Sequence, residues 1–356
     1  MQPHVVDSNN PLRSHGEAKT ILIADEDSDS RGSLSSLLES EGYHVVQAER
    51  GEKCLFLSME KAIDAFLIDL DMPGLDGADL CRRLRAMERH KISPIICLTD
   101  SDDDFAVNRA FSSGADDFIN KPINPTILKA RLSGHLQKLD YMQEMDRIRT
   151  NLNRYISRRT QTMVAAYSIT GVLPTPEEQD LCVLFSDVRG FTQMSQELEP
   201  TSLFNVLSNH LGMQVDCVYR YGGYIDKFAG DGIMAVFDSV DRVAEACACA
   251  LEIIEQTKQG NGASDAESLE LGIGIHAGTA LVGNIGSDMH LDYSVIGETV
   301  NLAARLCGCA EPMSIVVSER IAGIAQHLDG FEFGQPWTVS VRGVRNPISV
   351  YNLGHA

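Results

Sequence analysis

Between residues 19 and 135, short apolar runs alternate with helix-like segments, and this alternation leaves few folds open. TILIAD is followed by SRGSLSSLLESEGY, AFLIDL by GADLCRRLRAMERH, PIICLT by DDFAVNRAFSSG, and DFINKP by PTILKARLSGHL. Strands that are separated by helices become parallel neighbours, and the helices cover both faces of their sheet. The sequence therefore predicts a doubly wound α/β domain at residues 19–135, preceded by a disordered tail at residues 1–18.

A polar, helix-favouring stretch follows, at about residues 126–166. Its apolar residues lie three or four positions apart, which is typical of a helical seam that pairs with a partner. The stretch ends at GVLPTPEEQD, where glycine and two prolines stop the helix. We expect a helical, coiled-coil dimerisation linker at residues 136–177; the alternative is a solvated helix with one apolar side. The seam residues are Leu128, Leu132, Leu136, Leu139, Met142, Met145, Ile148, Leu152 and Ile156.

From residue 178 to residue 356 the pattern changes, because strand-like and helix-like segments are mixed without strict alternation. LCVLFSDV, GIMAVF, LELGIGIHAG, MSIVVS and ISVYNL are strand-like. PTSLFNVLSNHLGMQVDCVYRYG, VDRVAEACACALEIIEQTK and GETVNLAARLCGCA are helix-like. This mixture indicates a second domain with an organisation different from that of the first.

The formal net charge of −20 argues against nucleic acid as a partner, since an acidic surface repels phosphate. No apolar run is long enough to span a bilayer, and the first twenty residues lack the apolar core of a signal peptide. The nine cysteines are scattered without a C-x-x-C pair, as in a protein with reduced thiols. We therefore expect a cytoplasmic protein without a membrane span.

Acidic residues follow two strands of the first domain. Asp25 and Glu26 come just after the first strand, and Asp69 ends the third. The carboxyl ends of parallel strands line one crevice, so three carboxylates should converge there, where Mg²⁺ would balance their charge. Lys121 and Thr99, at the ends of two further strands, would add a cation and a hydroxyl.

These positions, with D-x-x-M-P-G-x-D-G and K-P, resemble the receiver domain of two-component response regulators, which has a flavodoxin-like fold. The resemblance implies that Asp69 accepts phosphate from a histidine kinase or a phosphotransfer protein. It also implies that Mg²⁺ is held by Asp25, Glu26, Asp69 and the backbone carbonyl of Asp71. Lys121 would contact the phosphoryl oxygens, and the switch residues would be Thr99 and Phe118.

The second domain carries two isolated carboxylates, in FSDVRGFT and KFAGDG. Asp187 and Asp231 are each expected at a strand end. So sparse a set suits Mg²⁺ that takes its other ligands from the phosphates of a nucleotide. A third segment, DYSVIGETVNLAARL, runs into a helix on which Asn301 and Arg305 share a face. An arginine there could stabilise charge on a transferring phosphoryl group.

The set FSDVRGFT, KFAGDG and DYSVIGETVNLAAR resembles the class III nucleotidyl cyclases, whose fold is a ferredoxin-like α+β sheet. The resemblance implies a homodimer with active sites at its interface and two Mg²⁺ or Mn²⁺ ions per site. Asp187 and Asp231 would bind the metals from one chain. The partner chain would supply Lys227 to read the base, Asn301 for the ribose and Arg305 for the transition state. Arg342 and Arg345 would contact the triphosphate.

The base-reading positions favour ATP. Lys227 has only donors, so it suits the acceptor N1 of adenine and opposes the N1–H of guanine. Ser294 stands at the second selector position of the family, and its hydroxyl can accept from the 6-amino group. The sequence therefore predicts an adenylate cyclase that forms 3′,5′-cyclic AMP and pyrophosphate. The hydroxyl at the second selector position resembles the subgroup of the family that bicarbonate stimulates, and the resemblance implies bicarbonate as a further ligand. The alternatives are a guanylate cyclase and a catalytically silent, dimeric signalling scaffold.

Overall fold

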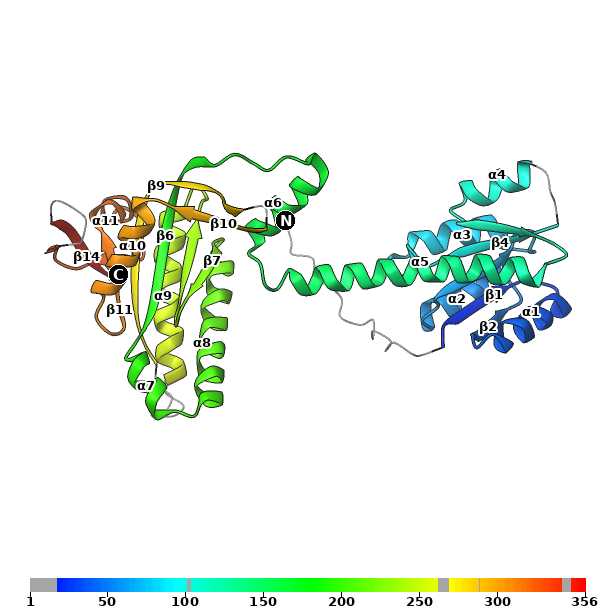
Figure 1. Cartoon of the computed structure of the whole chain (residues 1–356), viewed down its shortest axis with the longest axis horizontal. Coiled ribbons are helices and arrows are strands. Elements are labelled where there is room, and N and C mark those ends of the chain that lie inside the picture. Colours follow the sequence, from blue (N-terminus) through cyan, green and yellow to red (C-terminus); the bar gives the residue numbers. More distant parts are fainter. Residues whose placement is uncertain (1–17, 101–103, 262–268, 288, 341–346) are drawn as a thin grey trace. The chain divides into compact units, whose positions relative to one another are not determined.

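The computed structural model describes residues 18–100, 104–261, 269–287, 289–340 and 347–356. Most of the predicted tail, together with Arg342 and Arg345, lies outside these residues. The chain divides into two compact units, Met1–Arg149 and Thr150–Ala356 (Figure 1).

The first unit is built on a five-stranded parallel sheet in the order β2-β1-β3-β4-β5. This is the flavodoxin-like order, in which the chain reverses direction between β1 and β3. The doubly wound prediction is confirmed. The strands are β1 (Thr20–Ala24), β2 (His44–Ala48), β3 (Ala65–Asp69), β4 (Ile95–Thr99) and β5 (Asp117–Asn120).

Helices cover both faces of this sheet. Leucines of α1 and α5 pack on one face, and residues of α2, α3 and α4 pack on the other. Gly77, at the start of α3, lies so close to β3 that a Cβ there would be 2.2 Å from the Asp69 carbonyl oxygen. The helices are α1 (Ser28–Ser40), α2 (Gly51–Glu60), α3 (Gly77–Ala86), η1 (Glu88–His90), α4 (Asp104–Ser112) and α5 (Pro125–Leu152).

The helical stretch at residues 126–166 is not continuous. It forms α5 and then α6 (Arg158–Thr170), which begins where the Ser157 side chain accepts a hydrogen bond from the backbone of Thr160. The predicted seam is also wrong over its first half, because Leu128, Leu132 and Leu136 are buried in the core of the first unit. Leu139 is buried as well. After Leu139, the exposed apolar residues of α5 are Tyr141, Met142, Met145, Ile148 and Leu152.

The second unit contains a mixed sheet of nine strands among its described residues, with the main order β12-β14-β11-β9-β6-β8-β7. β10 pairs with β9, and β13 pairs with β14. The α+β, ferredoxin-like prediction is confirmed. The strands are β6 (Glu177–Arg189), β7 (Tyr224–Ala229), β8 (Gly232–Phe237), β9 (Glu270–Ser287), β10 (His290–Ile296), β11 (Ser314–Ser318), β12 (Phe331–Phe333), β13 (Trp337–Val339) and β14 (Ile348–His355).

The helices of the second unit pack against its sheet. Residues of α8, α9 and α11 join the larger core, and α10 packs on the other side of the sheet, against β9 and β6. Figure 1 shows α8 and α9 lying along the strands. The helices are α7 (Phe191–Glu197), α8 (Pro200–Arg220), α9 (Arg242–Asn261), α10 (Glu298–Cys309) and α11 (Glu319–Ala325).

Candidate functional site

Asp25, Asp69 and Lys121 meet at the carboxyl edge of the first sheet. The Lys121 Nζ lies 2.7 Å from Asp69 Oδ2 and 3.0 Å from Asp25 Oδ2. Both carboxylates are buried, since their residues are 4% and 0% exposed. This is the crevice between β1 and β3 that the strand order predicts for a ligand site.

Burial controls the electrostatics of this pocket. It raises the pKa of Asp69, against the hydrogen bonds that its carboxylate accepts from Lys121 and from the Asp71 backbone. Burial also lowers the pKa of Lys121, but hydrogen bonds to Asp69 and Asp25 outweigh it and the net shift is upward. Lys121 therefore stays charged beside two carboxylates that one cation cannot fully balance.

Two other residues predicted for this pocket, Glu26 and Asp71, are exposed. Glu26 is exposed, and no described group of three or more acidic, histidine or cysteine side chains is gathered as a metal cluster. The structure brings Asp25 and Asp69 together, and Glu26 follows β1 at an exposed position. The Asp71 side chain is exposed and pairs with Arg109 at 3.2 Å.

The two predicted switch residues lie at the ends of neighbouring strands. Thr99 is buried at the end of β4. Phe118, on β5, is half-buried and packs edge-on against Phe111 at a ring separation of 5.8 Å. Oxygen ligands from Asp25 and Asp69 fit a hard divalent cation, and Lys121 fits a phosphoryl oxygen.

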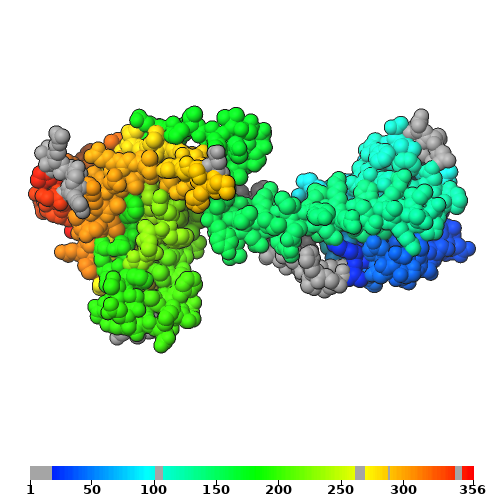
Figure 2. Space-filling view, in the orientation of Figure 1, coloured from blue at the N-terminus to red at the C-terminus, as the bar shows by residue number. Residues whose placement is uncertain are grey.

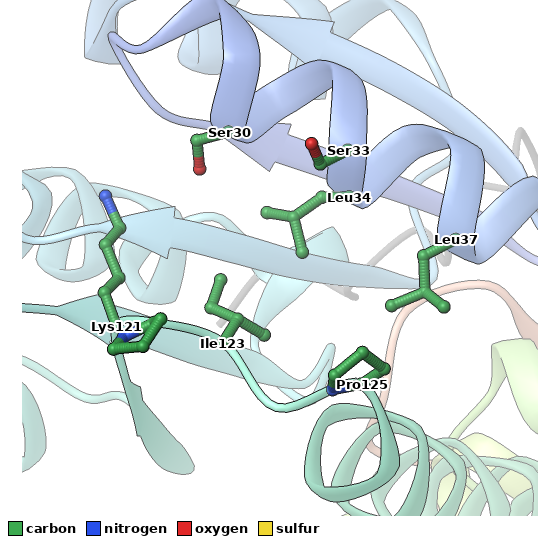
Figure 3. A pocket seen from close by; sticks show the side chains of 8 residues that line it. Ser30, Ser33, Leu34, Leu37, Lys121, Ile123 and Pro125 are labelled. Atoms are coloured by element: carbon green, nitrogen blue, oxygen red, sulfur yellow. The ribbon is translucent and has the colours of Figure 1, made fainter.

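A groove of about 460 Å³ lies next to this pocket. Figure 3 shows that α1 forms one wall and the segment after β5 the other. Lys121 lines the groove, and Ser30 lines it while donating a hydrogen bond to Asp25 at 2.8 Å. The other lining residues, mostly apolar, are Ser33, Leu34, Leu37, Pro122, Ile123 and Pro125.

In the second unit, a tight turn brings Asp231 to Asp187. Asp231 lies between β7 and β8, after Gly230, whose φ of 67° is left-handed. At Gly232 a Cβ would lie 1.8 Å from the Ser186 carbonyl oxygen, so only glycine allows β8 to start against β6 there. Burial, and secondarily the nearby charge of Asp187, raises the pKa of Asp231. Two converging carboxylates fit a divalent cation.

Sequence reasoning missed Arg189. β6 runs two residues beyond Asp187, and Arg189 Nη1 lies 2.6 Å from Asp187 Oδ2. The same guanidinium donates to the carbonyl of Cys307, near the end of α10. Arg189 therefore partly balances the carboxylate pair and ties its strand to α10. Alternation along β6 was the available signal, because it places Arg189 on the face of Asp187.

Lys227 and Ser294, from separate segments, meet as predicted. Lys227 Nζ donates to Ser294 Oγ at 2.9 Å. Ser294 in turn donates to Asp226 Oδ2 at 2.8 Å, and Lys227 Nζ lies 3.3 Å from the same oxygen. The Asp226 side chain is 2% exposed and that of Lys227 is 47% exposed. Sequence reasoning did not single out Asp226.

Lys227 borders a pocket of about 370 Å³ at the start of α10. Asn301 also lines it, whereas Asp187 and Asp231 do not. Arg305 follows one turn later on α10 and is half-buried. The remaining lining is mainly apolar and suits a flat aromatic ring: Phe185, Met234, Val295, Ile296, Gly297 and Val300.

Comparison with known proteins agrees with this geometry. The family model of the adenylate and guanylate cyclase catalytic domain matches residues 173–355, which is half of the chain. The chain belongs to the adenylate and guanylate cyclase family. The response regulator receiver domain model matches residues 21–133. The protein thus joins a receiver domain to a cyclase domain, and both predicted resemblances are confirmed.

Two curated relatives match this chain over part of their own length. An adenylate cyclase of Anabaena cylindrica is 27% identical over 213 residues, 57% of this chain and 42% of the relative. Adenylate cyclase 1 of Rhizobium meliloti is 31% identical over 182 residues, 49% of this chain and 27% of the relative. The chain therefore spans less than half the length of these curated relatives.

A solved bacterial light-regulated adenylyl cyclase shares the fold, with a TM-score of 0.52 and 22% identity over 67% of this chain and 68% of that one. Within the described part of the receiver–cyclase chain, no helix has the length and apolarity needed to cross a membrane.

Proposed function

We propose that this protein is an adenylate cyclase that converts ATP to 3′,5′-cyclic AMP and pyrophosphate under the control of its receiver domain. The observation that carries the proposal is the ammonium of Lys227 at the edge of an apolar pocket. Such a donor matches N1 of adenine and is mismatched with the N1–H of guanine. The adenylate cyclases among its relatives support the same choice.

In this proposal each side chain has one task. Lys227 reads the base with Ser294, Asn301 orients the ribose, and Arg305 stabilises charge on the α-phosphorus as the 3′-oxygen attacks and pyrophosphate leaves. Asp187 and Asp231 would hold two Mg²⁺ or Mn²⁺ ions, which supply activation of the 3′-hydroxyl and neutralisation of the phosphates. Arg342 and Arg345 would add triphosphate contacts. Bicarbonate remains a proposed stimulant of this hydroxyl-selector site.

A homodimer would complete each site. The pocket with Lys227 and Asn301 does not include the metal carboxylates, which supports metal residues from one chain and base, ribose and transition-state residues from its partner. The β9–β10 hairpin, yellow and orange in Figure 2, exposes apolar side chains that a second copy could cover. They are Leu281, Ile285, Leu291 and Ile296. The exposed residues of α5 after Tyr141 offer a second pairing surface.

The receiver domain would control this dimer by phosphorylation. Asp69 would attack the phosphorus of a phosphohistidine, the imidazole would leave, and Lys121 would bind a phosphoryl oxygen. The groove between α1 and the segment after β5 is the proposed seat of the histidine kinase or phosphotransfer protein, because Lys121 borders both groove and pocket. Asp25, Asp69 and the Asp71 carbonyl would hold Mg²⁺, and Glu26 would contribute from its exposed position next to Asp25. Such phosphorelay proteins act in the cytoplasm, where we place this protein.

The test measures cyclic nucleotide formation by the full chain. ATP or GTP is supplied with Mg²⁺ or Mn²⁺, with and without a small phosphodonor such as acetyl phosphate. We expect cyclic AMP as the main product and a rate that changes with phosphodonor. Asp69→Asn should abolish this response while basal turnover persists, and the matched exposed carboxylate variant Asp79→Asn should respond normally. Preferred turnover of GTP would instead indicate a guanylate cyclase, and no turnover by intact dimers would indicate a scaffold.

A further inference from the structure

Asp226 is a buried carboxylate to which the cyclase chemistry gives no task. Its side chain is 2% exposed, although a carboxylate without partners costs several kcal/mol to bury. Its partners are Ser294 Oγ at 2.8 Å and Lys227 Nζ at 3.3 Å, both on Oδ2. Burial raises the pKa of Asp226, and these two contacts oppose that rise.

The backbone of β7 explains how neighbouring residues reach the same hydroxyl. Successive side chains of a regular strand point to opposite faces. The β7–β8 register shifts between Ile225 and Lys227, which leaves Asp226 as an extra residue, as in a β-bulge. Bulges redirect side chains next to functional sites. Here the irregularity allows Asp226 and Lys227 to converge on Ser294 of β10.

The three contacts determine which hydrogens remain for a ligand. The single hydroxyl proton of Ser294 is directed to Asp226, so Ser294 can only accept from Lys227. An ammonium has three N–H groups. One of those of Lys227 goes to Ser294 and a second faces Asp226, which leaves one for the pocket. Ser294 itself is 2% exposed and does not line the pocket, so it acts on the base mainly through Lys227.

We propose that Asp226 is the positioning residue for base reading: directly and through Ser294, it fixes the Lys227 ammonium so that its remaining N–H meets N1 of adenine. The inference rests on the proposed adenylate cyclase function and deepens it. It makes preference for adenine depend on a residue that does not touch the substrate. Without Asp226, the flexible lysine side chain would lose two of its anchors, because Ser294 would also be free to rotate.

The test compares kcat/KM for ATP with that for 1-deaza-ATP, which lacks the N1 acceptor. In the wild-type protein we expect ATP to be preferred by at least about tenfold, as for a hydrogen bond from a charged donor. Asp226→Leu should reduce this preference to within about threefold by slowing ATP selectively. Asp226→Asn can still accept from Ser294 and should keep about half or more of the wild-type preference. Asp292→Asn, a nearby exposed carboxylate, is the matched control and should keep all of it.

A second variant covers the case in which Asp226→Leu does not fold. Ser294→Ala cuts the same chain of contacts with the loss of one oxygen, and it should lower the preference at least about threefold. Equal losses for both nucleotides in these variants, or an unchanged preference, would overturn the role of Asp226 while leaving the adenylate cyclase intact. A wild-type protein that does not use ATP would overturn both proposals at once. Light scattering on each variant shows that the dimer is retained.

Discussion

At the scale of single residues, one buried histidine, His210, and one half-buried histidine, His276, are expected to make the cyclase domain sensitive to acid. Burial lowers the pKa of His210 on α8 and of His276 on β9 to about 4, from an ordinary value of 6.5. Both are therefore neutral in the folded state near pH 5, whereas the unfolded chain binds protons there. The free energy of unfolding should keep its full value above about pH 6.5 and fall as the pH drops from 6.5 towards 4. At pH 5 the loss should be about 1–2 kcal/mol per histidine.

Urea unfolding at pH 7 and pH 5 measures this effect. His210→Leu should reduce the difference in the free energy of unfolding between pH 7 and pH 5 by the contribution of one histidine, whatever its effect on stability at pH 7. His327→Gln, at an exposed position, is the control and should leave the pH dependence unchanged. A steep, unaltered loss between the two pH values in His210→Leu would mean that other groups cause the acid sensitivity.

Single residues also show how far sequence reasoning reaches. Asp25, Asp69 and Lys121 were predictable because each follows a strand of a parallel sheet, and such ends converge. The meeting of Lys227 with Ser294 came from family resemblance. Asp226 was missed because its orientation depends on the shift in register within β7, which no residue pattern announces. The exposure of Glu26 was equally invisible, since adjacent residues after a strand need not share a direction.

At the scale of elements, the β7–β8 turn depends on a glycine. Gly232→Ala would place its Cβ 1.8 Å from the Ser186 carbonyl oxygen, so β8 must move away from β6 and carry Asp231 from Asp187. We expect a loss of about 1–3 kcal/mol in stability and at least about tenfold in cyclase activity.

The matched control for this turn is Gly212→Ala, on the exposed side of α8, where nothing lies within 4 Å of the added Cβ. Because alanine favours helix over glycine, this variant should be more stable by about 0.5–1 kcal/mol and fully active. Thermal unfolding and cyclic AMP assays measure both variants. Normal activity in Gly232→Ala would show that the turn tolerates displacement.

The helix α6 is fastened to the cyclase domain by its first turn. Arg159 donates to Gln179 Oε1 at 2.7 Å, pairs with Asp238, and stacks 5.4 Å from the ring centre of Tyr224. Its guanidinium also lies 6.0 Å from the ring centre of Tyr293, the neighbour of Ser294. A change in the linker could therefore reach the strands that carry Lys227 and Ser294.

Arg159→Ala should loosen α6 without unfolding the sheet. Loss of one ion pair and the ring contacts, about 1–2 kcal/mol, should speed amide exchange in residues 158–170 by about tenfold. The response to phosphodonor should fall by about half or more. Arg154→Ala, at an exposed position before α6, should change neither property. Unaltered exchange in Arg159→Ala would show that this arginine is not the fastening.

The linker helices show what a spacing pattern cannot predict. A three-to-four spacing predicted one helix with one partner-facing seam, but it cannot tell which partner covers each turn. The first leucines of α5 pack on their own sheet, whereas the seam residues after Leu139 are exposed. The break at Ser157 rests on a single cap, a weak signal inside a polar stretch.

At the scale of the whole molecule, the proposed dimer distributes one active site over two chains. Asp187→Ala removes a proposed metal ligand and Arg305→Ala removes the charge proposed to stabilise the transition state, so each variant alone should be nearly inactive. In a mixed dimer, one site receives both changes and the other receives neither. The intact site combines Asp231 and Asp187 of one chain with Asn301 and Arg305 of its partner.

Mixing the two inactive variants therefore tests the shared site quantitatively. If subunits exchange freely at equal amounts, about half of the dimers are mixed, and each has one working site out of two. Cyclic AMP formation should recover to about a quarter of the wild-type rate at equal total protein. A site contained within one chain predicts no recovery at any ratio. Mass spectrometry of differently tagged subunits must show that mixed dimers have formed, because absence of recovery then rules out the shared arrangement.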